Sequence, residues 1–351
     1  MIKYLGSKRT LVPALGAIAT AVGADTAVDL FTGTTRVAQE FKRRGIEVTA
    51  VDLATYSEVL ARCFIATDAT TVDPVELSEA LDDLSSTPGR RGYVTRTFCE
   101  ESRYFQPANG ERIDAIRDRI EERYRDSALY PVLLSTLLLA ADRVDSTTGL
   151  QMAYLKKWSP RSHRPLELRA PELLPGPGTA IRGDAMALVN QLPEVDLVYL
   201  DPPYNQHRYF TNYHVWETLV RWDEPDHYGV ACKRLDSKDE HTRSVFNGKR
   251  TMPGAFTELI GRVSGRFVVV SYNDESWVSA DTITEALART NECVELVAFD
   301  RPRYVGARIG IHNPEGAKVG TVGRLRNQEY LFLAGPAESV ARARAAIDSQ
   351  R

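Results

Sequence analysis

Residues 26–52 read TAVDLFTGTTRVAQEFKRRGIEVTAVD, and this stretch decides the fold. It begins with a short apolar run, Thr26–Phe31. A run with helical spacing, Arg36–Arg44, follows and ends at Gly45. The second apolar run, Glu47–Val51, ends at the acidic residue Asp52. A further helical run, Thr55–Ile65, follows. Strands that alternate with helices predict a parallel sheet covered by helices on both faces, which is an α/β, doubly wound fold.

The same alternation resumes after residue 178. Short apolar or β-branched runs predict strands at Thr179–Arg182, Val195–Leu200, Phe267–Ser271, Val294–Phe299 and Glu329–Leu333. Apolar residues at three- to four-residue spacing predict helices at Asp184–Gln191, Thr211–Arg221, Thr282–Arg289 and Ala337–Ile347. We interpret the polar stretch 222–266 as irregular. The last two strands flank a Gly- and Arg-rich connection, which predicts a hairpin at the sheet edge and therefore a mixed sheet.

The segment between residues 66 and 178 has a different pattern. Val75–Leu84, Glu111–Arg125 and Ala128–Val144 have helical spacing, and loops rich in Pro, Gly and Ser separate them. We therefore interpret residues 66–178 as a mainly helical insertion. Residues 1–65 and 179–351 together form the one α/β domain that surrounds it.

Two apolar stretches could indicate export or a membrane span. Leu11–Val22 follows basic residues, but Pro13 and Gly16 interrupt it and its apolar positions lie on one helical face, which favours a helix of the mature fold over a signal peptide. Ala128–Ala141 is shorter than the ~20 residues that a span needs. The four cysteines are far apart and indicate free thiols rather than a zinc or disulfide scaffold. We expect a cytoplasmic protein.

The composition of the 351 residues excludes collagen-like, low-complexity and wholly disordered chains, because 43% are hydrophobic and 26% charged. The net charge of −3 lacks the basic excess that is typical of nucleic-acid-binding domains. Two segments are nevertheless locally basic. Leu155–Arg169 has five Lys and Arg against Glu167 alone, and Arg301–Arg326 has six against Glu315 alone. DNA would respond to such local fields rather than to the sum.

Asp201-Pro202-Pro203-Tyr204 directly follows the apolar run Val195–Leu200. In open α/β sheets, ligands bind at the carboxyl ends of strands. Proline fixes φ and has no N–H, so the carbonyls of this segment remain available as acceptors. A carboxylate, a carbonyl and an aromatic ring suit a planar heterocycle with an amino group, because the acceptors take its two amine hydrogens and the ring stacks on the base. The alternative is a plain Pro-Pro turn with a surface tyrosine.

A second motif, Asp29-Leu30-Phe31-Thr32-Gly33-Thr34-Thr35, ends the first strand and opens a helix. It is neither G-x-G-x-x-G nor G-x-x-x-x-G-K-[ST], which favours an adenosyl ligand without phosphates. Asp52 lies 19 residues after Gly33, near the position of a ribose-binding acid, although capping of the next helix is an equal alternative. Asp184, after a later strand, is likewise a candidate for an adenine amine or for a helix cap.

Taken together, these motifs resemble the adenine-N6 DNA methyltransferases of the Dam-like class, and within it the methylases of type II and type IIS restriction systems. The matching stretches include Tyr4–Lys8, Asp29–Gly33, Asp201–Tyr204, Val270–Asn273 and Asn327–Leu331. After the Asp201 motif, the matching residues are Tyr204, Asn205, Tyr209, Asn212, Tyr213, His214 and Glu217, whereas Gln206, His207 and Arg208 differ from the family. Thr35 departs from the family's loop, which usually has a second glycine there. Because a β-branched residue disfavours positive φ, we expect a reshaped turn and weaker cofactor binding.

The resemblance implies a class I, Rossmann-like methyltransferase that uses S-adenosyl-L-methionine to methylate adenine N6 at specific sites in double-stranded DNA. It requires neither a metal nor a cysteine nucleophile, and a cognate restriction endonuclease is a possible functional partner. The implied catalytic residues are Asp201, Pro202, Pro203 and Tyr204. The implied cofactor-binding residues are Tyr4, Lys8, Asp29, Phe31, Gly33, Asp52 and Asp184.

The implied reaction is a direct methyl transfer to an adenine that has left the duplex. Asp201 and the Pro202 carbonyl each accept one N6 hydrogen, which orients the amine, and Tyr204 stacks on the base. We expect the helical insertion to contribute to target recognition. The residues expected to contact DNA are Lys156, Lys157, Arg161, Arg208, Tyr209, Arg301 and Arg303.

Three other functions remain open from the sequence. A methyltransferase on cytosine N4 or on an RNA base amine would keep the same fold, although the cytosine enzymes more often have Ser at the position of Asp201. A non-catalytic binding module would be expected to have lost the motif Asp201–Tyr204, which is intact here. An NAD- or NADP-dependent oxidoreductase would share the β-α-β pattern but needs the glycine-rich fingerprint.

Overall fold

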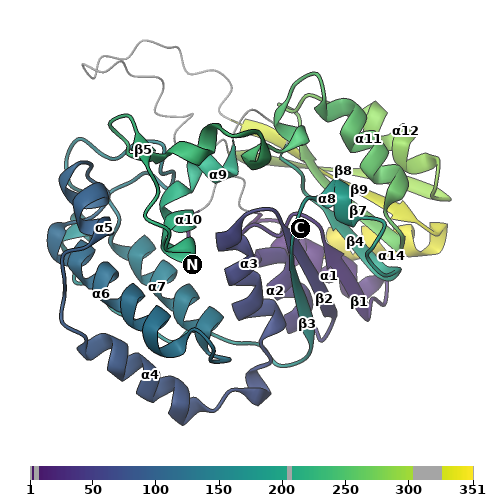
Figure 1. Ribbon diagram of the computed structural model, residues 1–351. Helices are drawn as coiled ribbons and strands as arrows, with labels where there is room; N and C mark the ends of the chain where they lie inside the picture. The colour runs from purple at the N-terminus through teal and green to yellow at the C-terminus, as the bar shows by residue number, and fades with distance from the viewer. Residues whose placement is uncertain (1, 4–7, 204–207, 303–325, 351) are drawn as a thin grey trace. The chain divides into compact units, whose positions relative to one another are not determined.

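The computed structural model describes residues 2–3, 8–203, 208–302 and 326–350 (Figure 1). The strands are β1 (Thr26–Asp29), β2 (Glu47–Asp52), β3 (Gly178–Arg182), β4 (Val195–Leu200), β5 (His227–Tyr228), β6 (Lys233–Arg234), β7 (Gly265–Asn273), β8 (Cys293–Pro302) and β9 (Arg326–Gly335). The α-helices are α1 (Val12–Ala21), α2 (Arg36–Arg43), α3 (Thr55–Ala61), α4 (Pro74–Ser86), α5 (Tyr93–Thr95), α6 (Pro107–Tyr124), α7 (Tyr130–Val144), α8 (Ala185–Leu188), α9 (Tyr209–Asn212), α10 (His214–Arg221), α11 (Met252–Arg262), α12 (Ala280–Ala288) and α14 (Ala337–Asp348).

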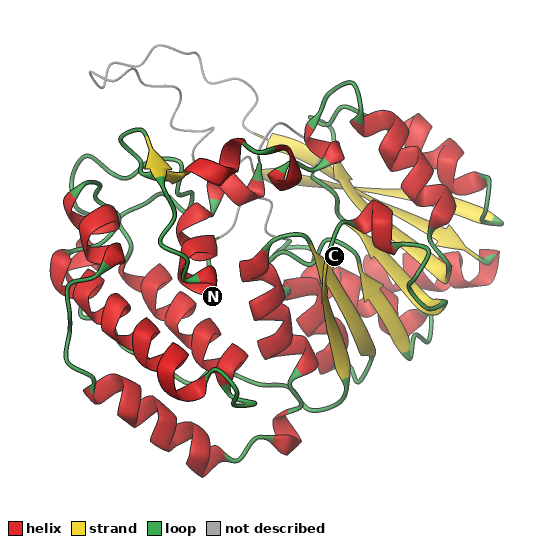
Figure 2. Cartoon of the chain, viewed as in Figure 1, coloured by secondary structure: helices red, strands yellow, loops and turns green. Residues whose placement is uncertain are grey.

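Seven strands form a mixed sheet in the order β3-β2-β1-β4-β7-β9-β8, and β5 and β6 form a separate antiparallel pair. Figure 2 draws the strands as yellow arrows and the helices in red. β1 and β3 each pair parallel with β2, and β4 pairs parallel with β7. β9 is antiparallel to both β7 and β8. The order is that of a doubly wound sheet to which an antiparallel edge hairpin has been added. The predicted α/β, doubly wound mixed sheet is therefore confirmed.

One compact unit of the chain consists of residues 1–16, 25–188 and 207–244. It contains the parallel strands β1 to β3, and helices α2 and α3 pack on β2. It also contains the helical segment, in which α6 packs on α7 and α7 packs on α3. Almost every residue of α7 is buried, which explains its continuous apolar sequence without any need for a membrane.

The other unit consists of residues 17–24, 189–206 and 245–351. It contains β4, β7, β9 and β8, and helices α12 and α14 pack on the edge strand β8 and its neighbour β9. Residues 267–272 of β7 are all buried, so this central strand has an apolar run instead of an alternating pattern.

Lys42, at the end of α2, is buried because its ammonium group caps the C-terminal end of another helix. Its Nζ donates to the carbonyls of Ile65 (2.6 Å) and Thr67 (2.8 Å), at the end of the π-helical turn Arg62–Ala66 that continues α3. These carbonyls have no intrahelical donor. Burial lowers the pKa of Lys42.

The interpretation of residues 222–266 as irregular is wrong, since they contain α11 and the β5–β6 pair. Helix α11 buries Met252, Phe256, Leu259 and Ile260, whose helical spacing was a usable signal. The helix predicted over Asp184–Gln191 is shorter, at Ala185–Leu188. No helix among the described residues is long and apolar enough to cross a membrane.

Candidate active site

The turn between β1 and α2 is fixed by the acidic end of β2. The Gly33 amide donates to Asp52 Oδ2 (2.8 Å), and the Ala54 amide donates to Asp52 Oδ1 (3.0 Å). One carboxylate therefore joins the glycine turn to the start of α3. Burial raises the pKa of Asp52, and the hydrogen bonds from Ala54 and Gly33 oppose that shift. Gly33 has a left-handed φ of 51°, which a residue without Cβ adopts easily.

Thr35 also has a left-handed backbone, with φ 61° and ψ 15°. The turn is thus not reshaped to avoid positive φ at this position, contrary to expectation. The fully buried Thr35 Oγ1 donates to the Thr34 carbonyl (2.7 Å) and accepts from Gln39 Nε2 (2.7 Å). The Thr35 carbonyl accepts the Gln39 amide (2.7 Å), which opens α2. These contacts hold a conformation that costs a residue with Cβ about 1–2 kcal/mol.

The other predicted cofactor residues of the first unit differ in exposure. Asp29, the last residue of β1, is buried, and Phe31 in the following turn is half-buried. Lys8 is also buried, with 4% of its surface exposed. Tyr4 lies outside the described residues. A role in cofactor binding stays a prediction for all four.

Asp184 lies just after β3, next to β2. The Gly183 amide donates to the Asp52 carbonyl (2.9 Å), which continues the pairing of the two strands. Asp184 Oδ1 accepts the Met186 amide (2.8 Å) and so caps α8. The structure thus shows the helix-cap alternative for Asp184, while its contact with a cofactor stays a prediction.

The motif that begins at Asp201 follows β4 directly, at the carboxyl end of the strand. β4 pairs with β7 in a register that sets Leu200 opposite Val270, so Asp201 lies beside Ser271. Asp201 is half-buried and Pro202 is buried. Tyr204 lies outside the described residues, so its predicted stacking stays a prediction.

The stretch Asn327–Leu331 is brought next to this strand end by β9. The register sets Tyr330 opposite Tyr272 of β7. Beyond the end of that pairing, the Gln328 amide donates to Asp274 Oδ1 (3.2 Å) and the Asp274 amide donates to the Gln328 carbonyl (3.1 Å). Three stretches that are far apart in sequence therefore meet at one end of β4, β7 and β9.

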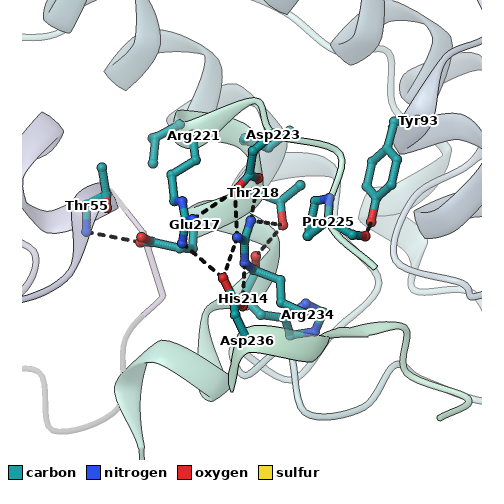
Figure 3. Close-up of polar contacts among 12 residues, drawn as sticks. Thr55, Tyr93, His214, Glu217, Thr218, Arg221, Asp223, Pro225, Arg234 and Asp236 are labelled. Carbon is teal, nitrogen blue, oxygen red and sulfur yellow. Dashed lines mark hydrogen bonds and ion pairs between the residues drawn. The ribbon is translucent and has the colours of Figure 1, made fainter. Parts of the chain in front are cut away.

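In the first unit, Glu217 of α10 caps the helix that follows Asp52 (Figure 3). Glu217 Oε2 accepts the amides of Thr55 (3.0 Å) and Tyr56 (3.2 Å). The N-cap residue of α3 is Ala54, whose side chain offers no acceptor. Glu217 is 1% exposed, so burial raises the pKa of its carboxyl group, and the bonds from Thr55 and Tyr56 oppose the shift.

The C-terminal end of α10 is tied to the β5–β6 region by a buried arginine (Figure 3). The Arg234 guanidinium donates to both carboxylate oxygens of Asp223 (2.6 and 2.7 Å) and to both of Asp236 (3.0 and 2.7 Å). It also reaches Thr218 Oγ1 in α10 (3.3 Å). A buried charge of this kind is tolerated because it is fully paired.

The N-terminal end of α10 is capped by a side chain from a remote loop. Gln151 Oε1 accepts the amides of Val215 (2.9 Å) and Trp216 (3.3 Å). The ring of His214 is completely buried, and its Nε2 lies 2.9 Å from the Gln151 carbonyl oxygen. Burial lowers the pKa of His214 to about 3. The ring is therefore neutral, and Nε2 carries the proton that it donates to this carbonyl.

The basic residues predicted to contact DNA have different environments. Lys156 and Lys157 are exposed. The Arg161 guanidinium donates to Asp145 Oδ1 (2.9 Å) and to the Thr147 carbonyl (2.6 Å). Arg161 thus organises its own loop, and a phosphate contact for it stays a prediction.

Arg208 and Tyr209 lie where α9 begins, and both are half-buried. The Tyr209 ring stacks on Tyr213, with ring centroids 6.3 Å apart and an interplanar angle of 16°. The Arg301 side chain and the whole of Arg303 lie outside the described residues. A DNA contact stays a prediction for all of these residues.

Sequence reasoning missed the roles of Glu217, Gln151 and Arg234. Glu217 had a usable signal, because an acidic residue among the apolar side chains of α10 needs a buried partner. Gln151 gave no such signal, since its partner Val215 is 64 positions away. The two acidic partners of Arg234 are close in sequence, but nothing in their spacing distinguishes them from surface charges.

The chain matches a protein-family model over most of its length. The model of the D12 class N6 adenine-specific DNA methyltransferases matches residues 4–285. The type II methyltransferase M.NlaIII of Neisseria lactamica is 32% identical over 286 residues, which cover 79% of this chain and 83% of that protein. The type II methyltransferase M.CviAII of Paramecium bursaria Chlorella virus 1 is 29% identical over 316 residues, which cover 87% and 88%.

A longer relative is the modification methylase StsI of Streptococcus sanguinis, 29% identical over 304 residues. The match covers 82% of this chain but 46% of that protein, so the chain spans about half of its length. Among solved structures, precorrin-6y C5,15-methyltransferase of Geobacter metallireducens GS-15 is 11% identical, with 95% of this chain and 92% of that chain covered. Its TM-score of 0.29 is too low to carry an argument.

Proposed function

The chain belongs to the D12 class of N6 adenine-specific DNA methyltransferases, and from this membership we propose which residues carry the reaction. The protein methylates adenine N6 in DNA and has the class I, Rossmann-like methyltransferase fold. The observation that carries the assignment of residues is the position of Asp201 at the carboxyl end of β4, beside β7 and ahead of two prolines.

We propose that the methyl donor is S-adenosyl-L-methionine and that the Gly33 turn and Asp52 bind it. The donor set fits an adenosyl group. The Asp52 oxygens accept the amides of Gly33 and Ala54, which fixes the carboxylate as an acceptor for a ribose hydroxyl. The left-handed Gly33 allows the backbone to approach a ligand closely. When bound, the donor supplies a methyl group activated by a sulfonium.

The remaining cofactor residues would complete this site. Tyr4 and Lys8 would border the methionine end of the donor, and Asp29 and Phe31, which precede the glycine turn, would line its other side. Asp184 would accept from the adenine amine with the oxygen that does not cap α8. These assignments rest on the motifs to which the residues belong and, for Asp29 and Asp184, on their positions at the ends of β1 and β3.

The acceptor amine would be held by Asp201 and the Pro202 carbonyl, each of which accepts one N6 hydrogen. The lone pair of N6 is delocalised into the purine ring, and these two acceptors favour the pyramidal geometry that attacks carbon. The N6–C bond forms as the S–C bond breaks, and N6 then loses its surplus proton. Pro203 keeps the backbone extended and Tyr204 stacks on the base. Alignment of the reacting atoms supplies much of the acceleration.

We propose that the substrate is double-stranded DNA with a specific site and that the target adenine is flipped out of the helix. Exposed Lys156 and Lys157 are the first candidates for phosphate contacts, and residues 66–178 would contribute to site recognition. The relatives are named type II and modification methylases, which supports a role beside a restriction endonuclease with the same site.

The test measures methyl transfer and donor binding separately. Asp201→Ala should abolish transfer of labelled methyl to DNA and leave the calorimetric affinity for S-adenosylhomocysteine unchanged. Asp52→Ala should weaken that affinity. Asp196→Ala is the matched control, because Asp196 lies on the same strand in an ion pair with Arg266 (3.2 Å) away from the carboxyl end. Full activity of Asp201→Ala would refute the assignment.

A further inference from the structure

Three side chains able to ligate a metal meet outside the proposed active site. They are Glu101, His227 and Cys232, and their ligand atoms all lie within 4.8 Å of one another. Glu101 follows the π-helical turn Arg96–Glu100, His227 is in β5, and Cys232 directly precedes β6. All three belong to the first unit. The residue types are a carboxylate, an imidazole and a thiol, which together match the donors that zinc prefers.

The distance between the imidazole nitrogen and the carboxylate oxygen is close to that of a tetrahedral zinc site. His227 Nε2 lies 3.3 Å from Glu101 Oε2. A nitrogen and an oxygen that both ligate zinc at ~2.1 Å with a tetrahedral angle are about 3.4 Å apart. The Glu101 side chain is 52% exposed and that of His227 26% exposed, so both have room for the small rotations that bring them toward the Cys232 sulfur.

The backbone that presents the thiol is already fixed. Cys232 has a left-handed φ of 44°, and its amide donates to the Gly229 carbonyl (2.9 Å). The hydroxyl of buried Tyr104 donates to the Ala231 carbonyl (3.0 Å). The backbone at Cys232 is therefore anchored before any metal arrives, and a pre-organised ligand loses less entropy on binding.

The charges of the three ligands also suit a divalent cation. One thiolate and one carboxylate balance two positive charges, and the imidazole binds as the neutral ring. Zinc binds the thiolate, so a metal that binds there releases the thiol proton to solvent.

We propose that Glu101, His227 and Cys232 form a zinc site that fastens the β5–β6 hairpin to the segment after residue 100. Three protein ligands leave the fourth position to water. β5 and β6 have two residues each, and so short a hairpin gains from a metal that links it to a second segment. The site takes no part in methyl transfer. Glu101 and His227 are 126 positions apart in the sequence, and His227 and Cys232 are 5 positions apart. The site therefore has no C-x-x-C pattern by which it could be found from the sequence.

The test titrates the reduced, metal-free full-length protein with Co²⁺, which reports a thiolate ligand through its near-ultraviolet charge-transfer absorption. We expect saturation at one Co²⁺ per chain and displacement by Zn²⁺. Cys232→Ser should lose the thiolate band, and His227→Ala should bind Co²⁺ at least tenfold more weakly. Cys293→Ser is the matched control, because Cys293 lies in β8 of the other unit, and it should keep the band.

Several results would overturn the proposal. Among them are binding without a thiolate band, which would indicate Co²⁺ on surface carboxylates, and a band unchanged in Cys232→Ser. An unchanged Co²⁺ affinity of His227→Ala would also overturn it. Because His227 is partly exposed, this variant is expected to fold, and the circular dichroism spectrum of the variant verifies this. Zn²⁺ should also raise the melting temperature of the unaltered protein and not that of Cys232→Ser.

Discussion

Replacing Glu217 with alanine removes the acceptor that caps α3 from a neighbouring helix. Glu217 Oε2 is the acceptor for the amides of Thr55 and Tyr56, and the amide just before them, that of Ala54, is bound by Asp52. The first turn of α3 therefore depends on two carboxylates from other elements. Loss of Glu217 leaves two donors without a partner at the point where Asp52 is held.

The cost follows from the burial of the two donors. A buried donor without a partner costs about 1–3 kcal/mol. The Tyr56 bond is buried and the Thr55 bond is partly buried, so the expected loss for Glu217→Ala is ~2–4 kcal/mol. Glu217→Gln keeps an acceptor oxygen and removes the buried charge whose pKa is raised, so it should stay within ~1 kcal/mol of the original protein.

The assay is urea unfolding followed by circular dichroism, together with calorimetric titration of S-adenosylhomocysteine. Glu217→Ala should also bind this ligand about tenfold more weakly. Binding would have to order Asp52 again, and a cost of ~1.4 kcal/mol for this step raises the dissociation constant tenfold. Exposed Glu122 on α6 provides the control, and Glu122→Ala should change stability by less than ~0.5 kcal/mol. If Glu217→Ala is as stable as the original protein, or if Glu217→Gln is as damaging as the alanine variant, the reasoning is refuted.

Three further predictions concern single side chains of the first unit. Thr35→Gly should be more stable than Thr35→Ala by ~1 kcal/mol in urea unfolding, because both lose the hydroxyl but only alanine keeps the left-handed strain; the reverse order would contradict it. Lys42→Met should cost ~1–3 kcal/mol by leaving the Ile65 and Thr67 carbonyls without their donor, and an unchanged unfolding midpoint would argue against this role. His214 has a folded pKa below its unfolded value, so its contribution is complete above about pH 6.5 and is lost as the pH falls toward about 3. Between about pH 5.5 and 4, the original protein should lose ~1.3 kcal/mol per pH unit relative to His214→Gln, and parallel stability curves would show that His214 titrates normally.

The sequence was informative wherever one local pattern determines the structure. The glycine turn, Asp52 and the strand before Asp201 lie where the alternation of strands and helices put them, because the carboxyl ends of parallel strands are fixed by the winding of the chain. The acidic end of β2 was predicted to bind a ribose or to cap a helix. The structure shows one oxygen on the Ala54 amide and the other on the Gly33 turn, a double role that spacing alone does not reveal.

Contacts between remote segments could not be predicted in the same way. The amides of α3 find their acceptor 162 and 161 positions away, in Glu217, and those of α10 find theirs in Gln151. Such pairs depend on how the helices pack against one another, and the hydrophobic periodicity of the sequence contains no information on that packing. Thr35 shows that a local rule can also fail. The preference of a β-branched residue against positive φ is outweighed here by hydrogen bonds with Thr34 and Gln39.

The central claim is that the carboxyl end of β4 presents adenine N6 for methylation. Mass spectrometry of the nucleosides from DNA incubated with the protein and labelled S-adenosyl-L-methionine tests it most directly. We predict labelled N6-methyl-2′-deoxyadenosine from the original protein and from Asp196→Ala, and none from Asp201→Ala. A label in N4-methyl-2′-deoxycytidine, or undiminished N6-methyl-2′-deoxyadenosine from Asp201→Ala, would contradict the account.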